Sequence, residues 1–196
     1  MAVKRAVFLD KDGTLIDDLP YNADPDRIRM AYGAGAALRQ LLDAGFRLFV
    51  VSNQSGIARG LIGEGAMDVV RERIALLLQQ EGVVLDGFYY CPHWPHGGTP
   101  ALRHLSHLAR TCDCRKPKPG MLLHAAQQHQ LTLTDSWMVG DILDDIEAGR
   151  RAGCRTVLID NGNETEWITG PLRQPHRRAQ NLPHAARIIM QLAGQS

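Results

Sequence analysis

The chain has 196 residues, of which 44% are hydrophobic and 22% charged, and its formal net charge is +1. This length and composition are typical of one globular domain, 1–196, and the small net charge gives no electrostatic case for nucleic acid or a membrane as a partner. We find neither a signal-peptide pattern nor an apolar run long enough to span a membrane, so we expect a cytoplasmic monomer.

Apolar segments with the length of buried strands alternate with segments of helical periodicity. Taken in chain order, the sequence predicts a strand at 6–9, a helix at 35–44, a strand at 46–51, a helix at 64–80, a strand at 87–90, a helix at 121–129, a strand at 137–139, a helix at 142–152, a strand at 155–159 and a helix at 185–192. Strands that alternate with helices form right-handed crossover units around a parallel sheet. We therefore predict an α/β, Rossmann-like three-layer sandwich. The basic residues at 173–178 are expected on a solvated loop.

Polar clusters follow three of the predicted strands. The first strand ends in Asp10-Lys11-Asp12 before a Gly-Thr pair, and later strands end in Ser52-Asn53-Gln54 and in Asp141. A lone Asp-Gly would be interpreted as a turn that caps a strand. Because the carboxyl ends of parallel strands meet at one edge of a sheet, we instead expect the three clusters to lie close together, at the place where ligands bind in such sheets.

The residue types at these strand ends indicate a particular chemistry. Clustered carboxylates repel one another unless a cation lies among them, and oxygen ligands suit Mg²⁺. The pair Arg115-Lys116 adds positive charge. A hydroxyl such as that of Ser52, together with the ammonium of Lys116, suits a phosphoryl group.

Three cysteines and a histidine form a second candidate site. They are Cys91, His93, Cys112 and Cys114, in the strings CPH and CDC. Three thiolates and one imidazole are a ligand set typical of tetrahedral structural zinc. The alternative is that the four residues are buried separately, but the segment 92–111 looks too polar to pack a core of its own, and reducing conditions favour metal binding over disulfides. We expect His96, His104 and His107 to be exposed, with His96 as a conceivable substitute ligand, and Cys154 to be buried and inert.

These motifs resemble those of the haloacid dehalogenase (HAD) superfamily of phosphohydrolases, in the same order and over nearly the whole chain. The strings that carry the resemblance are FLDKDGT, VVSNQSG, RKPKPG and MVGDILDD. The finer pattern is similar to the D-glycero-D-manno-heptose 1,7-bisphosphate 7-phosphatases, which serve ADP-heptose and lipopolysaccharide core precursor synthesis. Histidinol-phosphate phosphatases and other small sugar-phosphate phosphatases remain alternatives. QSGIARG and KPGM favour the heptose enzyme, although Ile142 stands where the family often has a basic residue.

The resemblance implies roles for individual residues. Asp10 would be the nucleophile and Asp12 the general acid and base, while Ser52 and Lys116 would hold the phosphoryl oxygens. Mg²⁺ would be held by Asp10, the backbone carbonyl of Asp12 and Asp141, with Asp145 orienting the site and Asp144 a weaker candidate that is simply solvated. Contacts to the sugar phosphate are expected from Asp18, Tyr21, Asn53, Gln54, Ser55 and Arg115. Zinc at about 91–114 would stiffen a small loop, and no large cap domain is expected.

One further hypothesis comes from a different functional class. A zinc-stabilised interaction module could retain a degenerate phosphatase fold. The presence of Asp10, Asp12, Ser52, Lys116 and Asp141 together argues against degeneration. Turnover of p-nitrophenyl phosphate with and without Mg²⁺ would distinguish the two hypotheses.

Overall fold

The computed structural model describes residues 4–63, 65–95 and 100–194. Within them, a parallel sheet has the strand order β3-β2-β1-β4-β5-β6. The strands are β1 (Ala6–Leu9), β2 (Arg47–Asn53), β3 (Gly87–Cys91), β4 (Trp137–Gly140), β5 (Arg155–Ile159) and β6 (Arg177–Ala179). The chain builds outward from β1 in one direction and from β4 in the other. This change of direction between neighbouring strands opens a crevice at their carboxyl ends, where α/β proteins bind ligands.

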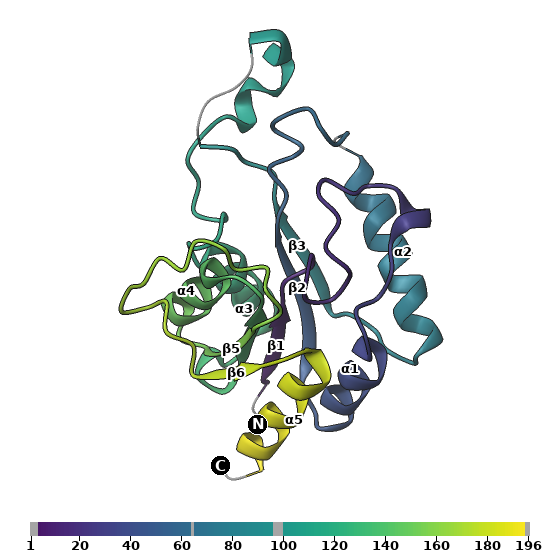
Figure 1. Ribbon diagram of the computed structural model, residues 1–196, viewed down its shortest axis with the longest axis vertical. Coiled ribbons are helices and arrows are strands. Elements are labelled where there is room, and N and C mark those ends of the chain that lie inside the picture. Colours follow the sequence, from purple (N-terminus) through teal and green to yellow (C-terminus); the bar gives the residue numbers. More distant parts are fainter. Residues whose placement is uncertain (1–3, 64, 96–99, 195–196) are drawn as a thin grey trace.

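Helices cover both faces of the sheet, as Figure 1 shows. The helices α1 (Ala34–Asp43), α2 (Ala66–Gln80) and α5 (Leu182–Ala193) lie on one face, and α3 (Gly120–His129) and α4 (Leu143–Ala152) lie on the other. The central strand β1 serves both layers, because successive side chains of a strand point to opposite faces. Val7 and Leu9 pack in one apolar cluster, and Ala6 and Phe8 pack in the other. The predicted three-layer α/β architecture is confirmed.

The predicted strands and helices are all present, with ends that shift by a few residues, but the sequence analysis missed β6. This strand has only three residues, two of them exposed arginines, so it has no apolar pattern to detect. The prediction that 173–178 is a solvated loop is confirmed for the exposed side chains of His176, Arg177 and Arg178, but it is wrong for Arg173 and for the strand at Arg177–Ala179. Arg173 is largely buried and pairs with Asp144 at 2.9 Å, and His176 Nδ1 accepts a hydrogen bond from the backbone N–H of Thr156 at 3.0 Å.

The segment that follows β3 also differs from expectation. It was expected to lack a core, yet residues Pro100–Leu108 form a 3-10 helix whose Leu105 and Leu108 are buried. This helix is at the top of Figure 1. The backbone N–H of Trp94 donates to the carbonyl of Leu108 at 3.0 Å, which ties the two arms of the segment together. His104 and His107 are exposed as predicted, and His96 lies outside the described residues.

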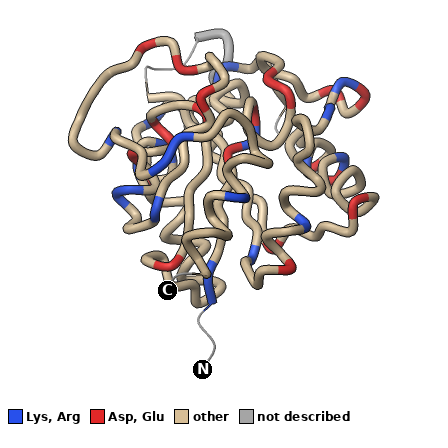
Figure 2. Tube along the Cα trace, turned by 60° about the horizontal axis from the view of Figure 1, so that its bottom comes forward, with Lys and Arg blue, Asp and Glu red and all other residues tan. Residues whose placement is uncertain are grey.

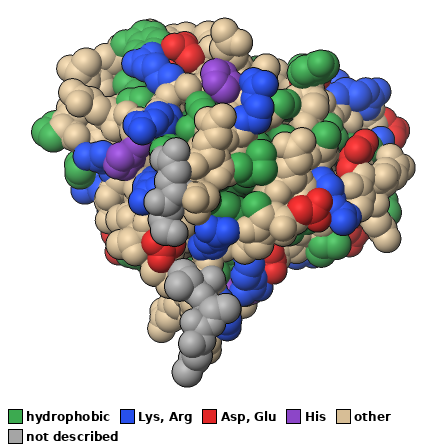
Figure 3. All heavy atoms as spheres, turned by 90° about the horizontal axis from the view of Figure 1, so that it is seen from below, with side chains coloured by type: hydrophobic (Ala, Val, Ile, Leu, Met, Phe, Trp, Pro, Cys, Tyr) green, Lys and Arg blue, Asp and Glu red, His purple; other side chains and the backbone are tan. Residues whose placement is uncertain are grey.

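Charged residues of both signs are interspersed along the chain (Figure 2). The face at the amino ends of the strands carries apolar side chains with Lys and Arg around them (Figure 3). A hollow of about 440 Å³ lies at this end, but its cations are already stacked on aromatic rings, Arg5 on Phe46 and Arg155 on Trp137. None of the described helices combines the length and apolar character needed to cross a membrane.

Candidate active site

The ends of β1 and β4 bring the first group of predicted residues together. Asp10 directly follows β1, and its backbone N–H donates to the carbonyl of Val139 in β4 at 2.9 Å. Asp141 directly follows β4, and Asp145 lies in the first turn of α4. All three carboxylates are buried, and their oxygen atoms come within 4.8 Å of one another. The predicted meeting of strand ends is confirmed for Asp10 and Asp141.

Lys116 supplies positive charge to this cluster from a separate loop. Its side chain is 1% exposed, and its ammonium pairs with Asp10, lies 2.6 Å from Asp145 Oδ1 and donates to the carbonyl of Val51 at 2.9 Å. Burial by itself would lower the pKa of Lys116, but the carboxylates of Asp10 and Asp145 outweigh it and raise that pKa. The lysine is therefore held charged between two acids.

One ammonium does not neutralise three carboxylates. Burial raises the pKa of Asp10 well above its ordinary value, and the neighbouring acids raise it further despite Lys116. Burial, followed by the charge of Asp145, raises the pKa of Asp141 to about 7. A cation that prefers oxygen ligands would stabilise the ionised forms, so the donor set fits Mg²⁺.

The side chain of Asp12 is bonded to residues outside the cluster of Asp10, Asp141 and Asp145. Gln54 Nε2 donates to Asp12 Oδ2 at 3.0 Å and to Ser52 Oγ at 2.8 Å, and the ammonium of Lys11 lies against the other oxygen of Asp12. Gln54 thus fixes an acid and a hydroxyl that come from two different strand ends. The Asp12 side chain remains 29% exposed, which leaves it accessible to a substrate.

Most of the residues expected to contact the substrate line one pocket of about 290 Å³ next to Asp12. These are Asp18, Tyr21, Asn53, Gln54 and Ser55. Asn53 also has a structural role, because its side chain and the backbone of Lys116 exchange two hydrogen bonds of 3.0 Å. Arg115 does not line this pocket. Its guanidinium lies 5.5 Å from the centre of the Trp94 ring, and among the described residues its buried Nη1 has no hydrogen-bond partner.

Asp141 is held by residues that were not predicted from the sequence. Asn163 Nδ2 donates to Asp141 Oδ2 at 2.6 Å, and the Thr14 hydroxyl lies 3.4 Å from Oδ1. Gly13 has φ +76°, and a Cβ there would collide with the carboxylate of Asp141. The Gly-Thr after Asp12 was a visible signal for this close approach, but a single Asn in a polar loop gave none.

The start of α4 separates the two acids that follow Asp141. Asp145 is fully buried, and its Oδ2 accepts a hydrogen bond from the backbone N–H of Ile142 at 3.3 Å, in keeping with the orienting role expected of it. Asp144 instead pairs with Arg173 at 2.9 Å. The expectation that Asp144 is simply solvated is therefore wrong. Ile142 is the residue before α4 and brings no charge to the site.

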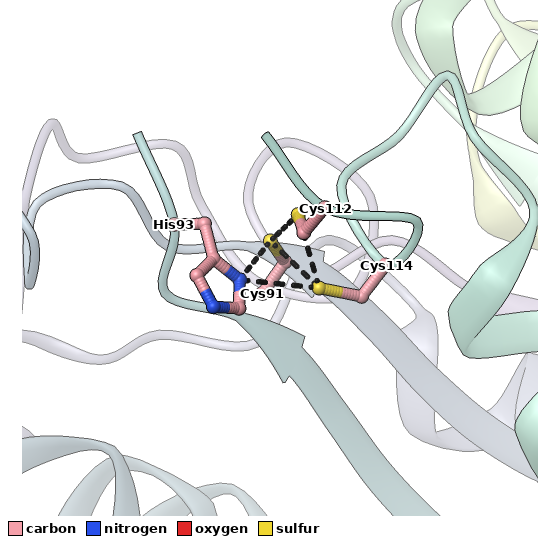
Figure 4. A group of neighbouring side chains, drawn as sticks. All are labelled: Cys91, His93, Cys112 and Cys114. Atoms are coloured by element: carbon pink, nitrogen blue, oxygen red, sulfur yellow. Dashed lines mark hydrogen bonds between the residues drawn. The ribbon is translucent and has the colours of Figure 1, made fainter. Parts of the chain in front are cut away.

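The Cys/His cluster lies at the end of β3 and is shown in Figure 4. The Sγ atoms of Cys91, Cys112 and Cys114 are 3.2–3.5 Å apart, and His93 Nδ1 lies 3.5 Å from Cys91 Sγ and 3.3 Å from Cys114 Sγ. Four ligand atoms that converge in this way fit a tetrahedral zinc site with every position filled by the protein. Cys154 is buried elsewhere, and burial raises the pKa of its thiol to about 12.

Comparisons with known proteins agree with this site. A HAD-hydrolase-like family model matches residues 113–185. A D-glycero-β-D-manno-heptose-1,7-bisphosphate 7-phosphatase of Haemophilus ducreyi is 44% identical over 161 residues, which are 81% of this chain and 85% of that protein. The Escherichia coli K12 protein of the same name is 40% identical over 176 residues, 85% of this chain and 89% of that protein.

A solved structure extends the agreement to three dimensions. The D,D-heptose 1,7-bisphosphate phosphatase of B. bronchiseptica, complexed with magnesium and phosphate, superposes with a TM-score of 0.78. It is 29% identical in sequence, and the match covers 96% of this chain and 99% of that one. The chain therefore belongs to the family of HAD-like phosphatases that includes the heptose-1,7-bisphosphate 7-phosphatases.

Proposed function

We propose that this phosphatase removes the 7-phosphate of D-glycero-β-D-manno-heptose 1,7-bisphosphate through an aspartyl-phosphate. One observation carries the proposal: Asp10 is buried beside Lys116 at the β1/β4 crevice, and Asp12 lines the adjoining pocket. The names of the relatives that share most of this chain supply the sugar and its anomer. A monomer suffices, because every residue invoked belongs to one chain. We place the protein in the cytoplasm, where its four free cysteines stay reduced.

In the first step, a carboxylate oxygen of Asp10 attacks the phosphorus of the 7-phosphate. An oxygen–phosphorus bond forms to Asp10 as the bond between phosphorus and the sugar oxygen breaks. The departing sugar oxygen keeps the electron pair of the broken bond and accepts a proton from Asp12. Lys116 faces the attacking carboxylate, and Gln54 donates a hydrogen bond to Ser52; these contacts support the proposal that Lys116 and Ser52 hold phosphoryl oxygens. In the second step, Asp12 takes a proton from a water whose oxygen bonds to phosphorus. The bond between phosphorus and Asp10 breaks, and inorganic phosphate and the free Asp10 carboxylate are released.

Mg²⁺ is the cation that we propose for the carboxylate cluster. Asp10, the backbone carbonyl of Asp12 and Asp141 would hold it. Its positive charge would offset the negative charge of the phosphoryl oxygens. Asn163 and Thr14 keep Asp141 in place, and Asp145 keeps Lys116 in place. Positioning and charge compensation of this kind are the main contributions that a protein makes to phosphoryl transfer.

Zinc is proposed for the Cys91, His93, Cys112 and Cys114 cluster, with a structural role. The four ligands leave no open coordination position, so the ion would do no chemistry. It would instead fix Arg115, which directly follows Cys114. We propose that Arg115 binds the phosphate that is retained on the sugar. The planar fork of arginine suits phosphate oxygens, and Ile142 offers no second cation.

The first test is a phosphate-release screen with and without Mg²⁺. The substrates are the heptose 1,7-bisphosphate, histidinol phosphate, p-nitrophenyl phosphate and other sugar phosphates. We expect Mg²⁺-dependent release with the highest kcat/KM for the bisphosphate. A higher kcat/KM for histidinol phosphate would overturn the proposed substrate while leaving the reaction class in place.

The second test concerns Arg115. We expect Arg115→Ala to lower kcat/KM for the bisphosphate by about 10²-fold, in line with the roughly 1.5–3 kcal/mol of a charged hydrogen bond. Hydrolysis of p-nitrophenyl phosphate, which has no second phosphate, should hardly change. Equal losses on both substrates would show that Arg115 serves the reacting phosphoryl group, and no loss on either would leave it a surface charge.

A further inference from the structure

Four side chains form a continuous stack beside the substrate pocket. The Tyr21 ring, which lines the pocket, lies 5.1 Å from the guanidinium carbon of Arg59, and the Arg59 guanidinium also donates a hydrogen bond to the Tyr21 hydroxyl. The same guanidinium lies 5.2 Å from the centre of the Trp94 ring, and that of Arg115 lies 5.5 Å from the same centre. Trp94 is therefore the residue that both arginines share.

The charges of these two arginines are not offset by a neighbouring acid, because neither has a carboxylate as an ion-pair partner in the described part of the chain. The described residues also leave the buried Nη1 of Arg115 without a hydrogen-bond acceptor. Two cations held against one ring repel each other, and a buried donor without an acceptor costs free energy. A dianion such as phosphate would relieve both costs, since its oxygens can accept hydrogen bonds from two guanidinium groups.

Trp94 is well anchored for a residue that positions others. It directly follows the zinc-type ligand His93, and its backbone N–H is bonded to the carbonyl of Leu108 at 3.0 Å. Arg115 directly follows Cys114 of the same cluster, whereas Arg59 comes from the loop after β2. The indole thus joins the Cys/His segment to the substrate-side loop.

We propose that Trp94 is a positioning residue for substrate specificity: its ring holds Arg59 and Arg115 together as a paired-guanidinium site for the phosphate that the enzyme does not hydrolyse. This inference rests on the proposed function, because it assigns the recognition of the second phosphate of the same substrate. It adds Arg59 to the binding group and makes the contribution of each arginine depend on the aromatic ring that both contact.

The test replaces the ring while keeping an apolar side chain. Trp94→Leu should lower kcat/KM for the heptose 1,7-bisphosphate about tenfold, mainly through KM, because the contacts between the ring and the two guanidinium groups are lost. Trp94→Phe, which keeps a ring, should recover most of the loss. Hydrolysis of p-nitrophenyl phosphate should stay within about twofold in both variants, and elemental analysis should show that both retain the zinc content of the wild type.

Trp167→Leu is the matched control. The guanidinium carbon of Arg178 lies 5.2 Å from the centre of the Trp167 ring, and neither residue lines the substrate pocket. It should leave both substrates unaffected. An equal loss on both substrates in Trp94→Leu, or Trp94→Phe no better than Trp94→Leu, would overturn the positioning role, as would unchanged bisphosphate kinetics. A wild type that does not hydrolyse the bisphosphate would overturn the proposed function and this inference with it.

Discussion

The buried contacts of Lys116 allow a quantitative prediction for Lys116→Met. The ammonium is 1% exposed and is shared by Asp10 and Asp145, the latter 0% exposed. Methionine fills the same space but leaves the buried acids without their cation. Removing one partner from a buried ion pair costs about 3–5 kcal/mol. For a chain of this size each kcal/mol lowers Tm by about 2–4 °C, so we expect a fall of about 6–20 °C.

The assay is thermal unfolding at pH 8.5 without added Mg²⁺, so that no divalent cation replaces the ammonium. Lys118→Met is the control, because Lys118 is 49% exposed and its partner Asp113 is 95% exposed. Such surface pairs contribute about 0–1 kcal/mol, and the expected change in Tm is at most ~4 °C. In the same samples, turnover with Mg²⁺ should fall about 10²–10³-fold for Lys116→Met alone, as is typical when a charge-stabilising donor is removed.

The difference in Tm between wild type and Lys116→Met should depend on pH. At pH 8.5 Asp141, with its pKa of about 7, is predominantly ionised and adds negative charge to the cluster around Lys116. As the pH falls to 5.5, Asp141 takes up a proton and the cluster needs a cation less, so the difference in Tm between wild type and Lys116→Met should shrink. A Tm for Lys116→Met at pH 8.5 no lower than that of Lys118→Met would refute the reasoning.

Three further predictions concern separate parts of the molecule. Asp10→Asn should abolish turnover, because an amide cannot act as the nucleophile. Tm should not fall, because burial raises the pKa of Asp10 and its ionised form opposes folding at neutral pH. A rate within about tenfold of wild type, a barrier change of only ~1.4 kcal/mol, would exclude the covalent mechanism. Cys112→Ser should bring the zinc content toward zero and leave the core folded, whereas Cys154→Ser should keep the zinc. Elemental analysis measures the zinc content and circular dichroism the fold, and a wild type without zinc would contradict this prediction. Burial and the charge of Arg150 lower the pKa of His176, so the stability it contributes is present above the unfolded pKa of about 6.5 and is lost as the pH falls through the folded value. Between pH 7.5 and 5.5 the Tm of His176→Gln should therefore fall less than that of wild type. Equal falls would show that the pKa of His176 is not lowered in the folded protein.

The strands, the acids that follow them and the Cys/His strings could be predicted from the sequence, because each consists of neighbouring residues. The apolar run of β1 and the acids directly after it are adjacent in sequence, and the order of strands and helices requires a parallel sheet. That arrangement alone brings Asp10 and Asp141 to one edge. The CPH and CDC strings likewise contain all four residues of the Cys/His cluster.

Only the tertiary structure decided which side chains are partners over long distances. Asn163 bonds to Asp141, Asp145 shares Lys116 with Asp10, and the Trp94 ring contacts both Arg59 and Arg115. These partners come from loops that have no periodic pattern, and their contacts depend on how the loops pack over the sheet. The short edge strand β6 was hidden for a related reason: its pairing with β5 is set by its neighbour, because three residues with two exposed arginines have no preference strong enough to show in the sequence.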